Sequence, residues 1–455
     1  MFCDKAISQT IGDHFASLTL SDLPPATVRS TRRALLDAVG VMLGATGLGE
    51  DAAPYRQRAM AETGPSRMLG FDRRTSPSLA ALANGALAHA LDFGDTFDAG
   101  PAHPNAALVP ALMALADADP RLDFGTVLTA MAAGSDLACR LSIAPARAYE
   151  DGGWYPPPLV NLIAGAAACA KLIGLDADGV RNAMGLALLQ GSFPSEIKYD
   201  ATSPMRGVRE ALVARAAVEA ALLARAGARA FSEPLEGKAG FFAVYGGGPP
   251  RDIVLADLGK RFLGDDVSIK PWPACRGTHP YIEAALALRG ELDLADIVAI
   301  EAETGPIQEM LIRPQPTKAA PARPIEAKFS IPYTVAAALL DGEVTLATFL
   351  PTRIGDDRTR ALAQKVVERR NPDWGRAQAA SGSLTVLLRD GTTRRCDVPQ
   401  AAGHPDRAIS DSDLISKFVD CAAYAATPLA AVDAERLANR ILSFSPDAST
   451  AGLLG

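Results

Sequence analysis

Segments with helical spacing of apolar residues follow one another through the first half of the chain, and they constrain the fold more than any other feature. In the first long segment, residues 26–43, apolar side chains recur every three or four positions. Alanine, the best helix former, is abundant, and aromatic residues make up only 6% of the chain. We therefore expect a domain of closely packed helices. Further predicted helices span residues 76–92, 104–116, 125–141, 159–173, 176–189 and 207–226.

The pattern changes after about residue 262. Alternating or β-branched residues predict strands at 267–270, 297–304, 384–388 and 394–398. Helices are expected between them at 280–288, 332–340 and 358–367, and again from 411 to about 442. The predicted fold class is therefore mainly α with an α+β second domain. We expect an all-helical domain at 1–262, completed by C-terminal helices at 405–455, and an inserted α+β domain at 263–404.

Charge and cysteine content exclude several classes of protein. The formal net charge is −7 and no dense run of Lys or Arg occurs, which argues against nucleic-acid binding. The six cysteines form no CxxC pair, and the N-terminus lacks an export signal, so we expect a cytoplasmic protein. The longest uncharged run, 152–170, contains three prolines and Asn161. It is interpreted as a loop entering a buried helix, so no membrane segment is expected.

The densest polar cluster lies at residues 84–104. His89 and Asp92 are three residues apart and would share one face of a helix. His103 stands in a Gly/Pro loop before the next helix, whose N-terminal N–H groups can hold an anion. A loop histidine beside carboxylates suits proton transfer. Alternatively, Asp95 and Asp98 only cap helices and the histidines are structural. Because no HExxH or EF-hand spacing occurs, no metal is expected.

Two further clusters and an arginine pair carry polar groups. Residues 270–280 bring Cys275 near His279 without a known cysteine-hydrolase signature. In 326–333, Lys328, Ser330 and Tyr333 would supply a cation, a hydroxyl and a phenol to a cleft, or would form a plain strand–helix junction. Arg206 and Arg209 would grip a substrate carboxylate through bidentate contacts, or be an ordinary surface pair.

These clusters, in this order, resemble the MmgE/PrpD family. The resemblance covers nearly the whole chain. It runs through residues 23–25, 36–41, 84–104, 167–175, 235–241, 275–279 and 327–333.

The resemblance implies an all-helical domain with an α+β lid domain, paired as a homodimer. It also implies chemistry without a metal or an organic cofactor, in which a proton is moved on a carbon near a carboxylate of a small di- or tricarboxylate. The family's site residues correspond to Asp92, Thr96, His103, His279 and Tyr333.

Two departures from the family pattern matter. Gly153-Trp154-Tyr155-Pro156 stands where dehydratase- and decarboxylase-like members tend to have Gly-Phe-His-Pro. Arg206 and Arg209 stand where they tend to have a lysine and a histidine. A guanidinium cannot readily give up a proton, so these arginines favour binding of a more highly charged substrate.

The sequence thus predicts an enzyme that abstracts a proton next to a carboxylate. We expect His103 as the general acid/base with Asp92 orienting it, and His279, Tyr333 and Tyr155 as proton donors. The expected substrate-binding residues are Thr96, Arg206, Arg209 and Lys328. A lyase of the 2-methylcitrate dehydratase type ranks first. The alternatives are a decarboxylase, an epimerase of the iminodisuccinate type, and a non-catalytic polycarboxylate-binding protein.

Overall fold

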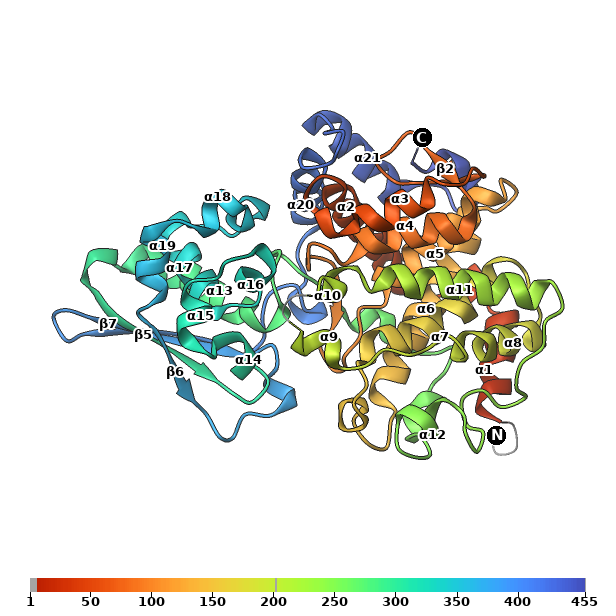
Figure 1. Ribbon diagram of the computed structural model, residues 1–455, viewed down its shortest axis with the longest axis horizontal. Helices are drawn as coiled ribbons and strands as arrows, with labels where there is room; N and C mark the ends of the chain where they lie inside the picture. The colour runs from red at the N-terminus through yellow and green to blue at the C-terminus, as the bar shows by residue number, and fades with distance from the viewer. Residues whose placement is uncertain (1–5, 201–202, 455) are drawn as a thin grey trace. The chain divides into compact units, whose positions relative to one another are not determined.

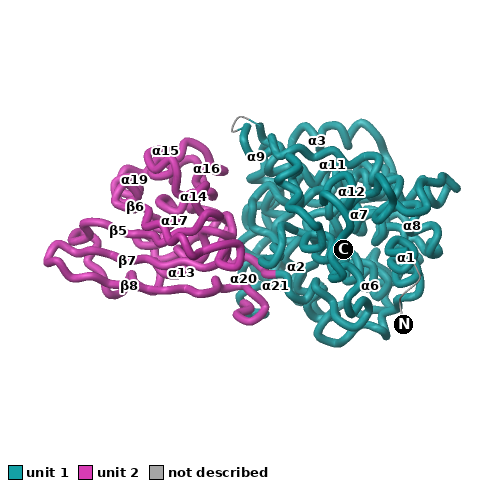
Figure 2. The backbone as a smooth tube through the Cα atoms, turned by 90° about the horizontal axis from the view of Figure 1, so that it is seen from below, with its two compact units in different colours: residues 1–267, 410–455 teal, residues 268–409 magenta. Residues whose placement is uncertain are grey.

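The chain divides into two units, which are coloured separately in Figure 2. The computed structural model describes residues 6–200 and 203–454. Unit 1 comprises residues 1–267 and 410–455, and unit 2 comprises residues 268–409. The boundaries predicted from the sequence, after residues 262 and 404, fall slightly earlier. Unit 2 is therefore an insertion, after which the chain returns to unit 1.

Unit 1 is built from helices, with short strands only at its loops (Figure 1). β1 (Ser66–Arg67) and β2 (Arg74–Thr75) pair antiparallel, and β3 (Asp95–Phe97) lies between two helices of the sequence. The helices are α1 (Ile7–Ser17), α2 (Pro25–Leu48), α3 (Ala53–Ala59), α4 (Pro77–Ala88), α5 (Asn105–Ala118), α6 (Phe124–Ile143), α7 (Pro156–Leu172), α8 (Ala177–Leu188), α9 (Glu196–Tyr199), α10 (Met205–Val208), α11 (Glu210–Arg225), α12 (Phe241–Tyr245), α20 (Asp411–Ala423) and α21 (Ala431–Ser443).

Helix starts follow local chemistry. Proline, which needs no N–H partner, opens α2 and α7. The carboxylate of Asp123 accepts a hydrogen bond of 2.7 Å from the N–H of Thr126 at the start of α6. Asp176 accepts one of 2.8 Å from the N–H of Gly179 at the start of α8. These caps explain why the predicted and observed starts nearly coincide.

The core of unit 1 consists of helices that are apolar on almost all sides. Every residue of α7 except Lys171 is buried. Small side chains let such helices approach closely, and Gly85 on α4 is an extreme case. A Cβ added to Gly85 would lie 2.7 Å from the carbonyl oxygen of Glu210, at the start of α11. The backbone of α11 is therefore set directly against α4, which fixes the position of the residues around Glu210.

Unit 2 has one sheet with helices packed on it (Figure 1). The strand order is β6-β5-β7-β8, with β5 and β6 parallel and the other neighbours antiparallel. α13 packs on β7 and β8, and α17 packs on α13 and α19. The strands are β4 (Val267–Ile269), β5 (Ile297–Thr304), β6 (Val366–Arg370), β7 (Gly382–Leu388) and β8 (Thr393–Val398), and the helices are α13 (His279–Leu288), α14 (Glu309–Ile312), α15 (Gln315–Ala319), α16 (Pro324–Lys328), α17 (Ile331–Asp341), α18 (Pro351–Ile354) and α19 (Asp357–Ala363).

The protein is thus mainly α-helical with small sheets, and three predicted helices need correction. The helix expected at 76–92 ends at Ala88. The one expected at 207–226 is divided into α10 and α11 at Arg209. The one expected at 358–367 ends at Ala363, and its last residues begin the strand β6. In that segment the β-branched pair Val366-Val367 favours a strand, and pairing with β5 overrides the helical spacing.

A buried arginine on α6, Arg140, connects this helix to the segment 253–261 of unit 1. The Nε of Arg140 lies 2.8 Å from the carboxylate of Asp136, and both side chains are 1% exposed. The other guanidinium nitrogens of Arg140 donate to the carbonyl oxygens of Ile253, Ala256 and Arg261 at 3.2, 2.5 and 2.8 Å. Burial raises the pKa of Asp136, and the positive charge of Arg140 partly offsets this rise.

We predict that Arg140→Met destabilises unit 1 by about 3–5 kcal/mol, because it leaves a buried carboxylate and three carbonyls without their donor. Urea unfolding followed by far-UV circular dichroism measures this change. Arg121→Met is the matched control, since it removes an arginine from an exposed pair with Asp119 and should leave the unfolding curve nearly unchanged. Equal curves for the two variants would contradict the prediction.

Candidate active site

The segment after α4 makes a tight turn that carries His89 and Asp92. His89 is the last residue bounding the helix, and the N–H of Asp92 donates to its carbonyl oxygen at 3.0 Å. Asp92 has a φ of 49°, a left-handed conformation that non-glycine residues adopt at a cost. The prediction that the two side chains share one face of a helix is wrong, because α4 ends before them. The turn nevertheless brings the two side chains into contact. His89 Nε2 lies 3.2 Å from Asp92 Oδ1, and the side chains are only 6% and 5% exposed.

His103 lies next to His89. Its Nδ1 is 2.7 Å from the carbonyl oxygen of Asp95, and the two imidazole rings are 4.7 Å apart between centroids. A carbonyl oxygen only accepts hydrogen bonds, so Nδ1 of His103 carries the hydrogen. In the neutral ring, Nε2 is then the nitrogen with the lone pair. His103 is half-buried, unlike the buried His89.

The carboxylate of Asp95 stabilises the start of α5. Its Oδ2 accepts hydrogen bonds from the backbone N–H and the side-chain amide of Asn105, at 3.0 and 2.8 Å. The anion site that the sequence predicts at this helix start is therefore filled by the chain itself. Thr96, which follows Asp95 and is the middle residue of β3, is also buried. Asp95 thus caps a helix through its side chain and fixes His103 through its backbone.

Arg209 and Glu210 form a fully buried pair between α10 and α11. Arg209 Nε lies 3.2 Å from Glu210 Oε1, and neither side chain is exposed. Burial raises the pKa of Glu210, while the charge of Arg209 acts in the opposite direction. The Nη2 atom of Arg209 is buried without a hydrogen-bond partner. A guanidinium in this state attracts an anion strongly once one reaches it.

Tyr155 provides the other neighbour of Arg209. The guanidinium carbon of Arg209 lies 5.1 Å from the centre of the Tyr155 ring, and the ammonium of Lys198 lies 5.5 Å from it. Such contacts stabilise a cation on an aromatic face. Arg206 is half-buried on α10, and its carbonyl oxygen accepts a hydrogen bond from Arg209. The two arginines therefore differ in environment and do not form a symmetric pair.

Asn161 connects these two groups of residues. Its side-chain amide donates to the carbonyl oxygen of His103 at 2.9 Å and lies 3.4 Å from Glu210 Oε2. Within unit 1, the structure thus links His103 through Asn161 to the Arg209–Glu210 pair. Sequence reasoning missed Asn161 and Glu210. Their signals were an isolated amide inside an apolar helix, and a carboxylate beside an arginine at a helix start.

In unit 2, the segment before His279 lies beside the segment that carries Lys328. The backbone N–H of Cys275 donates to the carbonyl oxygen of Lys328 at 3.0 Å. His279 is fully buried, with Nε2 3.2 Å from the carbonyl oxygen of Ala274. Lys328 is 4% exposed, and its ammonium lies 5.5 Å from the ring centre of Phe349. The junction predicted between a strand and a helix is instead a junction between the helices α16 and α17.

Tyr333, also in unit 2, is held inside the core. Its hydroxyl donates to the carbonyl oxygen of Thr348 at 2.6 Å, and the residue has no exposed surface. Burial raises its pKa to about 12. At the start of α17 its N–H donates to the hydroxyl of Ser330 at 3.0 Å, which caps that helix. The phenol proton is therefore occupied in a backbone hydrogen bond.

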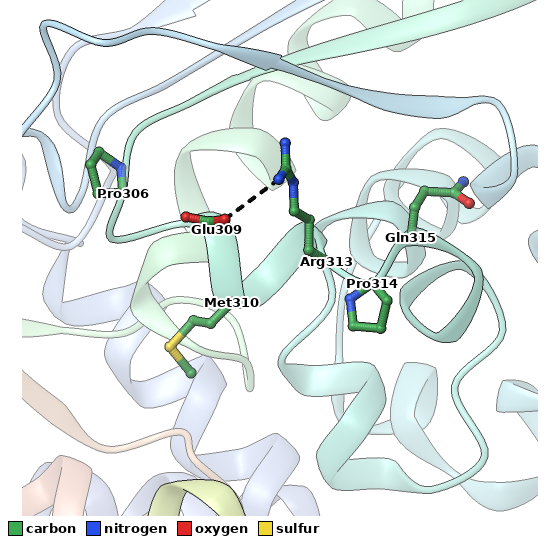
Figure 3. Close-up of a pocket in the computed structure, with 6 residues that line it drawn as sticks. All are labelled: Pro306, Glu309, Met310, Arg313, Pro314 and Gln315. Atoms are coloured by element: carbon green, nitrogen blue, oxygen red, sulfur yellow. Dashed lines mark ion pairs between the residues drawn. The ribbon is translucent and has the colours of Figure 1, made fainter.

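Elsewhere in unit 2 an open hollow of about 760 Å³ is lined by Pro306, Met310 and the residues drawn with them in Figure 3. Arg313 lines it and pairs with Glu309 at 3.5 Å. None of the predicted site residues lines this hollow. Within residues 6–200 and 203–454, no group of three His, Cys, Asp or Glu side chains is placed to hold a metal ion.

We predict that Tyr155→Leu destabilises the protein by about 1–2 kcal/mol, because the buried guanidinium of Arg209 loses its aromatic face. Tyr155→Phe keeps the ring and is the matched control, with stability close to that of the original chain. Thermal unfolding of the three proteins measures the difference. If both variants lose the same stability, the ring makes no contribution beyond that of leucine.

The model of the MmgE/PrpD N-terminal domain matches residues 9–253, and that of the MmgE/PrpD C-terminal domain matches residues 272–440. Cis-aconitate decarboxylase of Mus musculus is 27% identical, covering 91% of this chain and 86% of its own length. The Homo sapiens protein of the same name is 28% identical, covering 91% and 87%. The 2-methylcitrate dehydratase of Cupriavidus necator is 28% identical, covering 72% and 71%.

No helix in the described part of the chain is both long and apolar enough to cross a membrane.

Proposed function

The chain belongs to the MmgE/PrpD family, and we propose that it is a lyase for a small di- or tricarboxylate. The observation that carries the proposal is the arrangement of His103. Its Nδ1 is 2.7 Å from the carbonyl oxygen of Asp95, which leaves Nε2 as the proton acceptor of the neutral ring. A base with a fixed tautomer suits the removal of a weakly acidic proton from carbon.

Dehydration of the 2-methylcitrate dehydratase type is the first candidate. His103 Nε2 takes the proton from the carbon beside a carboxylate, and the electron pair of that C–H bond forms the new C=C bond. The hydroxyl group on the adjacent carbon receives a proton and leaves as water. The hydroxyl of Tyr155 is the donor that we propose in unit 1, and the family resemblance adds His279.

Decarboxylation is the second candidate. It is favoured by the larger share of the chain that aligns with the relatives named cis-aconitate decarboxylase. In that reaction the bond between a carbon and its carboxylate breaks, carbon dioxide leaves, and the carbon that keeps the electron pair takes up a proton. Both reactions pass through a state with extra negative charge on carbon and its neighbouring carboxylate.

Cations stabilise this charge and bind the carboxylates. We propose Arg209 for this role in unit 1, since its buried Nη2 has no hydrogen-bond partner of its own. Arg206, Lys328 and Thr96 complete the proposed substrate-binding residues. For Tyr333 we propose a structural role, because its hydroxyl donates to the carbonyl of Thr348. Acid, base and charge stabilisation are thus assigned to side chains, without a cofactor.

The experiment that tests the proposal is NMR of candidate substrates incubated with the protein in D₂O. The panel contains 2-methylcitrate, citrate, cis-aconitate and the stereoisomers of iminodisuccinate. We expect a new alkene for dehydration, or loss of carbon dioxide with one deuterium incorporated for decarboxylation. Deuterium in an otherwise unchanged skeleton would instead favour an epimerase. A protein that binds these compounds but exchanges no proton would be a binding protein, and the lyase proposal would fail.

We expect His103→Asn to lower kcat by about 10²-fold or more on the compound that reacts, because the base is removed. His404→Asn is the control, since His404 is outside the proposed site residues. Its Nδ1 accepts a hydrogen bond of 3.2 Å from the backbone N–H of Asp406 and lies 3.5 Å from the carboxylate of the same residue. Circular dichroism checks that both variants are folded. Near-normal turnover by folded His103→Asn would show that another group is the base.

A further inference from the structure

A buried ion pair joins the C-terminal segment of unit 1 to its first long helix. Lys417 Nζ on α20 lies 2.5 Å from Asp37 Oδ1 on α2, and the two side chains are 6% and 1% exposed. Neither residue belongs to the polar clusters that the sequence singles out. Burial of such a pair contributes little net stability, since the loss of hydration offsets the attraction of the charges. Its presence therefore calls for a reason other than stability.

The backbone brings Lys417 to its position through close helix packing. A Cβ added to Gly40 on α2 would lie 2.8 Å from the ring of Phe418, the residue after Lys417. α20 can therefore contact α2 only because a glycine faces it. The helix starts with Ser410 and Asp413, whose side chains satisfy each other's backbone N–H groups. Because the start of α20 and the face that packs on α2 are both fixed, the backbone position from which the Lys417 side chain extends is fixed as well.

The ammonium of Lys417 holds Phe93 in two ways. It donates a hydrogen bond of 2.6 Å to the carbonyl oxygen of Phe93 and lies 3.9 Å from the centre of the Phe93 ring. Phe93 directly follows Asp92, the residue with a φ of 49°. A left-handed aspartate costs roughly 1 kcal/mol and persists only where its surroundings hold it. The two contacts with Phe93 supply that restraint on one side of Asp92.

On the other side, Asp92 is held by His89. The N–H of Asp92 donates to the His89 carbonyl at 3.0 Å, and its carboxylate meets His89 Nε2 at 3.2 Å. The orientation of this carboxylate thus depends on a turn whose far end is fixed by Lys417. His89 in turn lies against His103, with ring centroids 4.7 Å apart. A continuous set of contacts leads from Asp37 through Lys417, Phe93, Asp92 and His89 to His103.

We propose that Lys417, held by Asp37, is a positioning residue that sets the Asp92 turn for catalysis. It touches Phe93 and acts on the reacting groups only through Asp92 and His89. The inference rests on the proposed function in one respect, namely that Asp92 and His103 work on the substrate. The packing of Lys417 on Phe93 is independent of which carboxylate reacts.

The test compares the original chain with the double variant Asp37→Asn/Lys417→Met, in which neither partner remains as a buried unpaired charge. Lys171→Met is the matched control. Lys171 also donates to two backbone carbonyls of unit 1, those of Phe15 and Leu18, at 2.7 and 2.5 Å. We expect the double variant to fold and to lose about 10- to 100-fold in kcat with KM changed less than about threefold, because misplaced groups slow the chemical step more than they weaken binding. Lys171→Met should retain kcat.

A second measurement does not depend on a substrate. The chain has five histidines, so histidine labelled with ¹³C gives five ring signals. The double variant should shift the signals of His89 and His103 and leave that of His14 in place. Lys171→Met should shift His14, which senses the charge of Lys171, and leave His89 and His103 in place. If the double variant does not fold, Phe93→Leu keeps the carbonyl contact and removes the ring, and it should shift the same two signals to a smaller extent.

The outcomes separate the two proposals. Unchanged signals of His89 and His103, or an unchanged kcat in the folded double variant, would overturn the positioning role of Lys417. A drop in kcat with a matching rise in KM and no shift of the two signals would also overturn it. If no carboxylate of the panel reacts with the original chain, while the two signals still shift, the proposed function fails and the structural link from Lys417 to His103 stands.

Discussion

Nearly complete burial of the central helices is the constraint on which the rest of unit 1 depends. A polar group inside such helices has no water to bond, so its partner must come from the chain. This requirement explains why Asn161, a buried amide on the mostly apolar α7, donates to the carbonyl of His103. It also explains the pairing of Arg209 with Glu210. The groups that remain without such a partner, such as Arg209 Nη2, are where a ligand gains most by binding.

The same constraint shapes the histidine turn. His103 is held through a main-chain oxygen of Asp95, while the carboxylate of that residue caps α5. One residue therefore determines both the ring orientation of a histidine and the start of the helix beside it. Because Nδ1 faces this carbonyl oxygen, it carries the hydrogen in the neutral ring, and the lone pair is on Nε2.

Much of the helical fold could be predicted from local chemistry, because caps and apolar spacing are local signals. The starts of α6 and α17 follow from Asp123 and Ser330, and the strand β5 was expected at the residues it occupies. The predicted helix at 358–367 was wrong at its end, since pairing of β6 with β5 is a long-range effect that no window of sequence contains. Asp92 and His103 could be named from their motif, but the left-handed turn that joins them to His89 could not.

The residues that sequence reasoning missed share one property. Glu210, Asn161 and Lys417 each have a hydrogen-bond partner far away in the chain. Their importance appears only when helices from different parts of the chain are packed together. The Lys417–Phe93 hydrogen bond, for example, spans 324 positions of sequence.

That separation has a consequence for how the protein is made. On the ribosome, α2 and the Asp92 turn are synthesised early, whereas α20 follows only after all of unit 2. Until α20 is synthesised, the ammonium of Lys417 can contact neither the carboxylate of Asp37 nor the carbonyl oxygen of Phe93. Unit 2 has its own sheet and core and can form during this delay. We therefore expect the histidine turn to be among the last parts of the nascent chain to reach its final form.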